Sequence, residues 1–164
     1  MRFGQIVLDE VKKRGLEPKE TNERRIREEI RKKHGMAAMA ILNYPKFKKL
    51  LKKGNVIADG LYSWDEYKFL KEKFRKQMIL IAIFAPPELR YHRISERVMP
   101  ETDSDLRHRP FTKDEAKSRD FAEIENLDKG GPIAMADYTI LNTKDPAFLL
   151  QQVKELYTDI EKTN

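Results

Sequence analysis

The stretch NVIADGLYSWDEYKFLKEKFRKQMILIAIFA, residues 55–85, decides the fold. It joins a short apolar run at 55–59 to an amphipathic pattern at 63–74 and then to an unbroken apolar run at 77–85. An apolar run without a polar face is typical of a strand that is buried on both sides, as in a parallel sheet. Strand, helix and strand in this order therefore predict an α/β fold with a parallel sheet between layers of helices.

The flanking segments extend this prediction to the whole chain. Helical spacing and capping residues predict helices at 5–14, 23–34, about 37–53 with an interruption near Pro45, 86–98, 112–127 and about 146–162. A further strand is expected at 137–141, whereas residues 99–111 lack periodicity and are expected to form a loop. We expect residues 1–164 to form a single domain.

Composition excludes several classes of protein. The chain has no cysteine, which excludes disulfides, thiolate metal sites and thiol catalysis. No apolar run approaches the ~18 residues that span a bilayer, and no signal peptide is evident, so we expect a cytoplasmic protein without membrane contact. The histidines His34, His92 and His108 lack the spacing of metal ligands. A net charge of +6 favours a phosphate-bearing partner, whether a nucleotide, a coenzyme or a nucleic acid.

Asp59 and Gly60 end the first apolar run and leave two interpretations open. A carboxylate at the carboxyl end of a parallel strand lies where open α/β sheets bind ligands, and in phosphoryl transfer such a group holds Mg²⁺ or orients the acceptor. The same pair also suits an ordinary turn, since glycine readily adopts a positive φ. The local pattern does not decide between a site and a turn.

Arginines form a second candidate constellation. Arg90, Arg93 and Arg97 are three and four residues apart and therefore share one helix face. Guanidinium groups bind phosphates in a bidentate manner, so the cluster favours a phosphoryl-transfer site beside a loop that closes over it. Salt bridging within the chain is the alternative, as it is for the basic run at 24–33. Three further arginines follow in the sequence, namely Arg107, Arg109 and Arg119. The candidate salt-bridge partners are Glu88, Glu96 and Glu115.

Several segments together resemble a known family. They are VIADGLYSWDEYKFLKEKF (56–74), LIAIFAPPELRYHRISER (80–97), SRDFAEIENLDKGGPIAMADYTILN (118–142) and the closing helix, preceded by FGQIVLDEVKKRGLEP (3–18) and EIRKKHGMAAMA (29–40). In this order, and over nearly the whole length, the chain resembles the dephospho-CoA kinase-like nucleotide kinases. This is the P-loop family close to dephospho-CoA kinase and adenylate kinase.

The resemblance implies a three-layer, Rossmann-like P-loop kinase fold with a helical acceptor-binding region at about 20–53 and a lid at about 99–127. It also implies ATP and Mg²⁺ as the co-substrate and the metal of a phosphoryl transfer. Carried over by position, it assigns catalytic roles to Asp59, Arg93, Arg97 and Arg119, with Asp59 also as the metal ligand. In the same way it assigns substrate binding to Arg31, Gly60, Arg107, Arg109 and Asp120, and the adenine pocket to Asn142.

The chain departs from this family in one important respect. The family's glycine-rich loop, Gly-x-x-x-x-Gly-Lys-Ser/Thr, which cradles the ATP phosphates, has no match in the sequence. The family's first core strand, expected between 55–59 and 78–84, is absent with it. Because unpaired strand edges are unfavourable, we expect these two strands to close on each other, or a homodimer or another partner to supply the missing strand.

The sequence therefore supports three hypotheses of function. The first is ATP-dependent phosphoryl transfer to a small acceptor, of the dephospho-CoA or nucleoside monophosphate type, in a chain that is truncated or impaired. The second is a binding or regulatory protein without catalysis on a kinase scaffold, favoured by the missing loop. The third is a nucleic-acid-binding module, which rests on charge alone because no recognition motif accompanies it.

Overall fold

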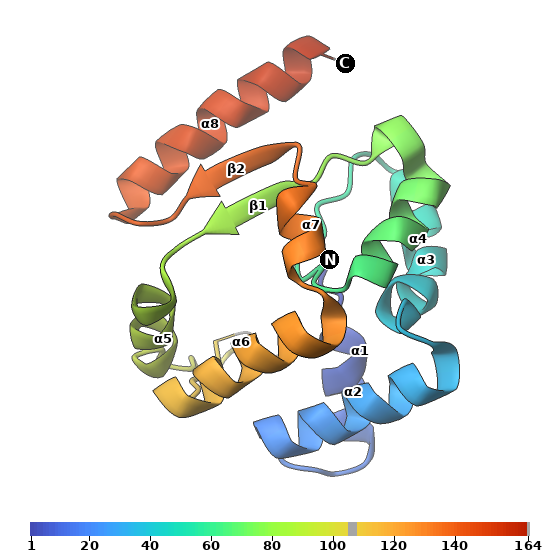
Figure 1. The fold of residues 1–164 in the computed structure, drawn as a ribbon, viewed down its shortest axis with the longest axis vertical. Helices are drawn as coiled ribbons and strands as arrows, with labels where there is room; N and C mark the ends of the chain where they lie inside the picture. The colour runs from blue at the N-terminus through green and yellow to red at the C-terminus, as the bar shows by residue number, and fades with distance from the viewer. Residues whose placement is uncertain (105–107, 164) are drawn as a thin grey trace.

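Helices make up most of the structure and surround a small sheet (Figure 1). The computed structural model describes residues 1–104 and 108–163. The elements are α1 (Gln5–Lys13), α2 (Glu20–His34), α3 (Ala38–Leu51), α4 (Trp64–Phe74), the 3₁₀ turn η1 (Arg75–Gln77), β1 (Ile81–Phe84), α5 (Pro87–Ser95), α6 (Lys113–Leu127), α7 (Gly130–Ala134), β2 (Tyr138–Leu141) and α8 (Pro146–Thr163). The expected α/β class is confirmed at this level.

The sheet is parallel and has two strands in the described part of the chain. β1 pairs with β2 in a register that places Ile81 beside Tyr138 and Phe84 beside Leu141. The chain between them passes through α5, α6 and α7, and β2 lies between β1 and α8 (Figure 1). The parallel orientation and the strand at 137–141 agree with the sequence prediction, but a three-layer P-loop kinase fold is not established by so small a sheet.

The predicted strand at 55–59 is wrong. Asp59 forms only an isolated parallel bridge with Arg2, through a hydrogen bond from Phe3 N to Asp59 O of 2.9 Å and one from Asp59 N to Met1 O of 2.8 Å. A strand needs a ladder of such bonds on a partner of similar length, and residues 1–3 are followed at once by α1. The segment also does not close on β1, which pairs with β2 instead.

The predicted burial of the second apolar run is also wrong. Ile83 and Phe84 in β1 remain 63% and 51% exposed, although the run has no polar face. The physical reason is that a strand becomes buried only when strands on both sides and helices on both faces cover it. In the described part of the chain β1 has a strand neighbour on one side only.

The early helices follow the sequence with two exceptions. α1 ends before Gly15, whose φ of 65° gives the left-handed stop that the sequence predicts. α2 begins at Glu20, three residues before the predicted start, and α3 continues through Pro45 without the predicted interruption. Residues on both sides of this proline are buried: Phe47 belongs to the hydrophobic core, and Asn43 donates to Phe3 O at 3.2 Å.

The main hydrophobic core lies between the first four helices. It contains contacts between aromatic rings, such as that between Phe3 and Phe47, whose ring centroids are 5.7 Å apart. Its buried members are Phe3, Val7, Val11, Ile26, Met39, Ala40, Phe47 and Leu70. None of the helices in the described ranges combines the length and the apolar character that crossing a bilayer requires.

Candidate functional site

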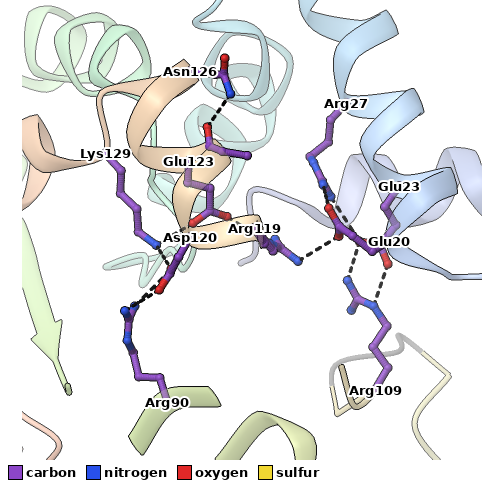
Figure 2. A network of polar contacts seen from close by, with 11 residues as sticks. Glu20, Glu23, Arg27, Arg90, Arg109, Arg119, Asp120, Glu123, Asn126 and Lys129 are labelled. Carbon is purple, nitrogen blue, oxygen red and sulfur yellow. Dashed lines mark hydrogen bonds and ion pairs between the residues drawn. The ribbon is translucent and has the colours of Figure 1, made fainter. Parts of the chain in front are cut away.

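A group of charged side chains lies where α2 and α6 face each other (Figure 2). Three of its members, Glu23, Arg109 and Glu123, are buried and the others are partly buried, although proteins normally keep such residues in water. We call it the charged network. Its members are Glu20, Glu23 and Arg27 from α2, Arg90 from α5, Arg109 from the segment before α6, Arg119, Asp120 and Glu123 from α6, and Lys129, which precedes α7.

Glu23 and Arg109 form the buried part of the network on the α2 side. The Nε and Nη2 atoms of Arg109 donate to the two carboxylate oxygens of Glu23 at 2.7 Å each. Arg27 contacts Glu23 at 3.5 Å and also pairs with Glu20. Two parallel, charge-assisted hydrogen bonds fix a guanidinium group far better than a single contact. The pair therefore ties α2 to the segment that leads into α6.

Two carboxylates and their cationic partners form the α6 side. Lys129 Nζ donates to Glu123 Oε2 at 2.6 Å and to Asp120 Oδ1 at 3.1 Å. The Nη1 and Nη2 atoms of Arg90 donate to Oδ1 and Oδ2 of Asp120 at 3.3 and 2.5 Å. Burial alone would lower the pKa of Lys129, but the two carboxylates outweigh it and the pKa is raised. Burial alone would raise the pKa of Asp120, yet Lys129 and Arg90 outweigh it and the pKa is lowered. Lys129 and Asp120 are therefore charged at neutral pH.

Arg119 joins the two sides of the network (Figure 2). Its Nε donates to Glu123 at 3.0 Å, and its Nη1 lies 3.7 Å from Glu20 on α2. Burial alone would lower the pKa of Arg119, but these carboxylates raise it above its ordinary value. The pair Glu20 and Glu123 thus holds a permanent positive charge between two helices that are far apart in the sequence.

Arg31 and Glu66 lie at the border of the network. Arg31 Nε is buried and has no hydrogen-bond partner among the described residues, and burial lowers the pKa of this arginine. Glu66 is only 2% exposed, and its Oε1 also lacks a partner there. Burial raises the pKa of Glu66 to about 7, against the opposing effects of Arg31 and of the backbone N–H groups of Met39 and Ser63. The pair therefore combines an unsatisfied donor with a carboxyl group that titrates near neutrality.

Tyr62 connects Asp59 to the network. The Nζ of Lys129 lies 5.0 Å from the centre of its ring, and the pKa of the tyrosine is raised by burial, by Glu123 and by Asp59. Although 37% of the Tyr62 surface stays exposed, its phenol lies close enough to these carboxylates to respond to them. Asp59 itself is exposed and forms the isolated bridge with Arg2.

The structure brings some of the predicted site residues together. Arg31, Arg109, Arg119 and Asp120 lie in or beside the charged network. Gly60 adopts a φ of 95°, a turn conformation that favours glycine. Asp59 is near Tyr62, but no group of three or more Asp, Glu or His side chains that could hold a metal occurs in the described ranges.

Other predicted site residues lie elsewhere. Arg93 donates to Asn142 O at 2.7 Å and to its Oδ1 at 3.0 Å, so these two residues meet just beyond the carboxyl end of β2. Arg97 is exposed beyond the end of α5. Arg107 lies outside the described residues. The partners of the arginines also differ, since Arg90 pairs with Asp120, which is not among the expected Glu88, Glu96 and Glu115.

Comparison with known proteins identifies the family. No protein-family model matches the chain. Over 160 residues the chain is 31% identical to the UPF0200 protein of Thermococcus onnurineus and 32% identical to that of Thermococcus kodakarensis, which covers 96% of this chain and 82% of each relative. The chain belongs to the UPF0200 family. Its match to the UPF0200/UPF0201 protein of Archaeoglobus fulgidus is 31% identical and covers 98% of this chain but 47% of that protein, about half of its length.

Membership of the UPF0200 family corrects the resemblance described above. Recognition of the chain as a dephospho-CoA kinase-like nucleotide kinase is wrong, because these relatives are named as UPF0200 proteins and not as dephospho-CoA kinase or adenylate kinase. The motifs that carried the resemblance have ordinary structural uses in this UPF0200 chain. Gly60 has a positive φ of 95°, which favours glycine, and Arg90 and Arg119 form ion pairs.

Sequence reasoning missed several members of the charged network. The missed members are Glu20, Glu23, Glu123 and Lys129, and Glu66 at the border was missed as well, whereas Arg27 belongs to the basic run at 24–33. The signal was present in part, since Glu23 with Arg27 and Arg119 with Glu123 are pairs four residues apart. Such pairs are common on solvated faces, and exposed examples occur on the same helix, such as Arg25 with Glu29. Only the approach of α2 to α6 shows which pairs are buried.

Proposed function

We propose that this chain binds a small phosphate-bearing molecule, of nucleotide-like type, beside Arg31 at the border of the charged network. The observation that carries the proposal is the buried Nε of Arg31, which lacks a hydrogen-bond partner among the described residues. A buried donor without a partner costs about 1–3 kcal/mol, more when it is charged. Phosphate oxygens are acceptors that suit a guanidinium group, and binding one would remove this cost.

The electrostatics of the surroundings support the same ligand class. Arg31 is repelled by Arg27 and attracted by Glu66 and Glu123, so it belongs to the electrostatic environment of the network. Below its pKa of about 7, Glu66 is neutral and no longer neutralises Arg31. An anion bound there would accept a hydrogen bond from the unpaired Nε of Arg31 and would be attracted by its positive charge. This attraction is stronger in a region shielded from water than at the surface.

Phosphoryl transfer from ATP to this ligand stays a prediction of the sequence. The residues present do not fit a complete site for ATP and Mg²⁺. Asp59 is a single exposed carboxylate without a second and third ligand among the described residues, and the sequence contains no glycine-rich phosphate loop. The proposed function is therefore binding alone.

Calorimetric titration of the full chain tests the proposal. The probes are AMP, ADP, dephospho-CoA and inorganic phosphate. We expect Arg31→Met to weaken binding of the best probe by about 10-fold or more, as expected for the loss of a charge-assisted hydrogen bond. The matched control is Arg25→Met, which removes the same charge from an exposed arginine of the same helix that is paired with Glu29 at 3.0 Å. This control is expected to leave the affinity within about twofold.

Two outcomes contradict the proposal. One is the absence of heat with every probe at millimolar concentration, and the other is an equal loss of affinity in both variants, which would indicate only general attraction to a basic protein. Incubation of the same samples with ATP and Mg²⁺, followed by detection of ADP, tests the predicted phosphoryl transfer separately.

A further inference from the structure

The side of β1 that faces away from β2 carries main-chain groups without a strand partner in the described residues. Leu80 O and Phe84 O accept hydrogen bonds from the β2 side, from Tyr138 N at 3.2 Å and Asn142 N at 2.7 Å. Main-chain groups of a strand point to its two sides with a period of two residues. The N–H and C=O groups of Ile81 and Ile83 therefore point to the other side, which we call the open edge.

The two edges of the sheet differ in whether their main-chain groups have hydrogen-bond partners. On the outer edge of β2, Leu141 N donates to Gln152 Oε1 at 2.9 Å, and Gln152 Nε2 donates to Leu141 O at 2.8 Å. This side-chain amide takes the place of a neighbouring strand. The open edge of β1 has no such cover in the described part of the chain, and residues 78–85 contain no charge and no proline. Proteins usually protect a free edge with such residues, so their absence indicates an edge that is paired in the working protein.

The large accessible surface area of the chain supports the presence of a binding partner. The accessible surface is 11261 Å², whereas a compact monomer of 19.4 kDa is expected to expose about 8,500 Å². The excess of about 2,800 Å² is more than the ~800 Å² that each partner contributes to a stable interface of standard size. Ile83 and Phe84, the most exposed residues of β1, lie on the strand that carries the open edge.

We propose that the open edge of β1 binds an extended, uncharged, apolar strand of a partner polypeptide. Figure 1 shows that this edge is turned toward α6 and α7, while β2 and α8 lie on the opposite side of β1. One added strand needs only the ~4.8 Å spacing of a sheet. A second copy would have to bring its own β2 and α8 into the same region, so a single strand fits the geometry better. The proposal is independent of the ligand beside Arg31.

A tethered strand tests the proposal on the full chain. The probe is the sequence Thr-Val-Val-Ile-Val, fused to the N-terminus through a Gly/Ser linker of about 16 residues, which spans about 22 Å on average and keeps the strand at high effective concentration. We expect the midpoint of thermal unfolding to rise by roughly 4 °C or more. Amide exchange measured by NMR is expected to slow at least tenfold at Ile81 and Ile83, whose N–H groups gain partners.

The matched control is the same tether with proline at the second and fourth strand positions, which removes two donors and prevents regular pairing. This control is expected to change neither the unfolding midpoint nor the exchange of the two amides. Equal behaviour of the two tethers overturns the proposal. Light scattering of the chain without a tether measures its oligomeric state and provides a second test. A dimer in which the amides of Ile81 and Ile83 are already protected would identify a second copy as the occupant and would overturn the proposed foreign strand.

Discussion

Glu66 shows how one residue can serve the fold and still respond to its surroundings. It is the third residue of α4, and the N–H groups of Ser63 before α4 and Met39 in the first turn of α3 favour its charged form. Negative charge near helix N-termini is stabilising, which gives Glu66 a structural role. Burial opposes the charge and raises the pKa to about 7, so the group changes its protonation state near neutral pH.

Replacement of Glu66 by glutamine tests this balance through the pH dependence of stability. The pKa of the folded state, about 7, lies above the ordinary value of 4.5, so the folded protein keeps a proton that the unfolded chain releases between these values. Stability of the wild type therefore falls as the pH rises through this window, by up to about 3 kcal/mol. Glu66→Gln has no such loss. We expect the variant to gain stability relative to the wild type from pH 5 to pH 8 in urea unfolding experiments.

Glu28→Gln is the control for this series, because Glu28 is an exposed residue paired with Arg24 on α2. Its stability relative to the wild type is expected to be the same at both pH values within error. If the Glu66→Gln and wild-type curves run parallel from pH 5 to pH 8, the raised pKa of Glu66 is refuted.

At the scale of elements, the contact between Glu23 and Arg109 joins α2 to the segment before α6. Removing one partner of a buried ion pair leaves an uncompensated charge and typically costs about 3–5 kcal/mol. We expect Arg109→Met to destabilise the chain by this amount, measured by urea unfolding. Addition of Glu23→Gln to this variant is expected to recover part of the loss, since the buried carboxylate would otherwise keep only its 3.5 Å contact with Arg27. A double variant that is less stable than Arg109→Met contradicts this account.

Elements with a strong local signal were predictable from the sequence, and those that depend on a distant partner were not. α1 follows from its apolar spacing and Gly15, and α6 from Thr112, whose side chain and that of Glu115 cap each other's backbone. The run at 55–59 has the composition of a strand, yet a strand exists only where another offers a ladder of hydrogen bonds. For the same reason the apolar run of β1 predicted burial that its surroundings do not supply.

The candidate site was predictable only in part. Arginines such as Arg31 and Arg119 were selected because their chemistry suits phosphate, and this chemistry is a property of the residue type. The partners that decide whether an arginine is satisfied come from other helices, as Glu20 does for Arg119. The unsatisfied Nε of Arg31 depends on such a distant environment, so no local pattern indicates it.

At the scale of the whole molecule, the hydrophobic core is unevenly distributed. The main cluster lies in α1 to α4, whereas Ile140 is the one fully buried residue in the described strands and the apolar residues Leu150, Val153 and Tyr157 of α8 are exposed. Regions with few buried apolar contacts open at lower free energy than the core. We expect amides of β1, β2 and α8 to exchange with solvent well before those of α1 and α3.

Hydrogen exchange followed by mass spectrometry measures this difference, because each region yields its own peptides. Peptides from α1 and α3 are expected to report the free energy of global unfolding, and peptides from α8 a smaller one. Uniform protection across the chain would show that the sheet is as stable as the core and would contradict the expected order of opening.

The amide of Gln152 has a consequence for self-assembly. Growth of a β-fibril requires two adhesive edges on every subunit, one to join the growing end and one to receive the next subunit. Gln152 occupies the outer edge at Leu141, so each sheet offers a single adhesive edge. A molecule that joins another through β1 would leave only the edge that Gln152 covers at Leu141, so we expect polymerisation through the sheet to stop after the first addition.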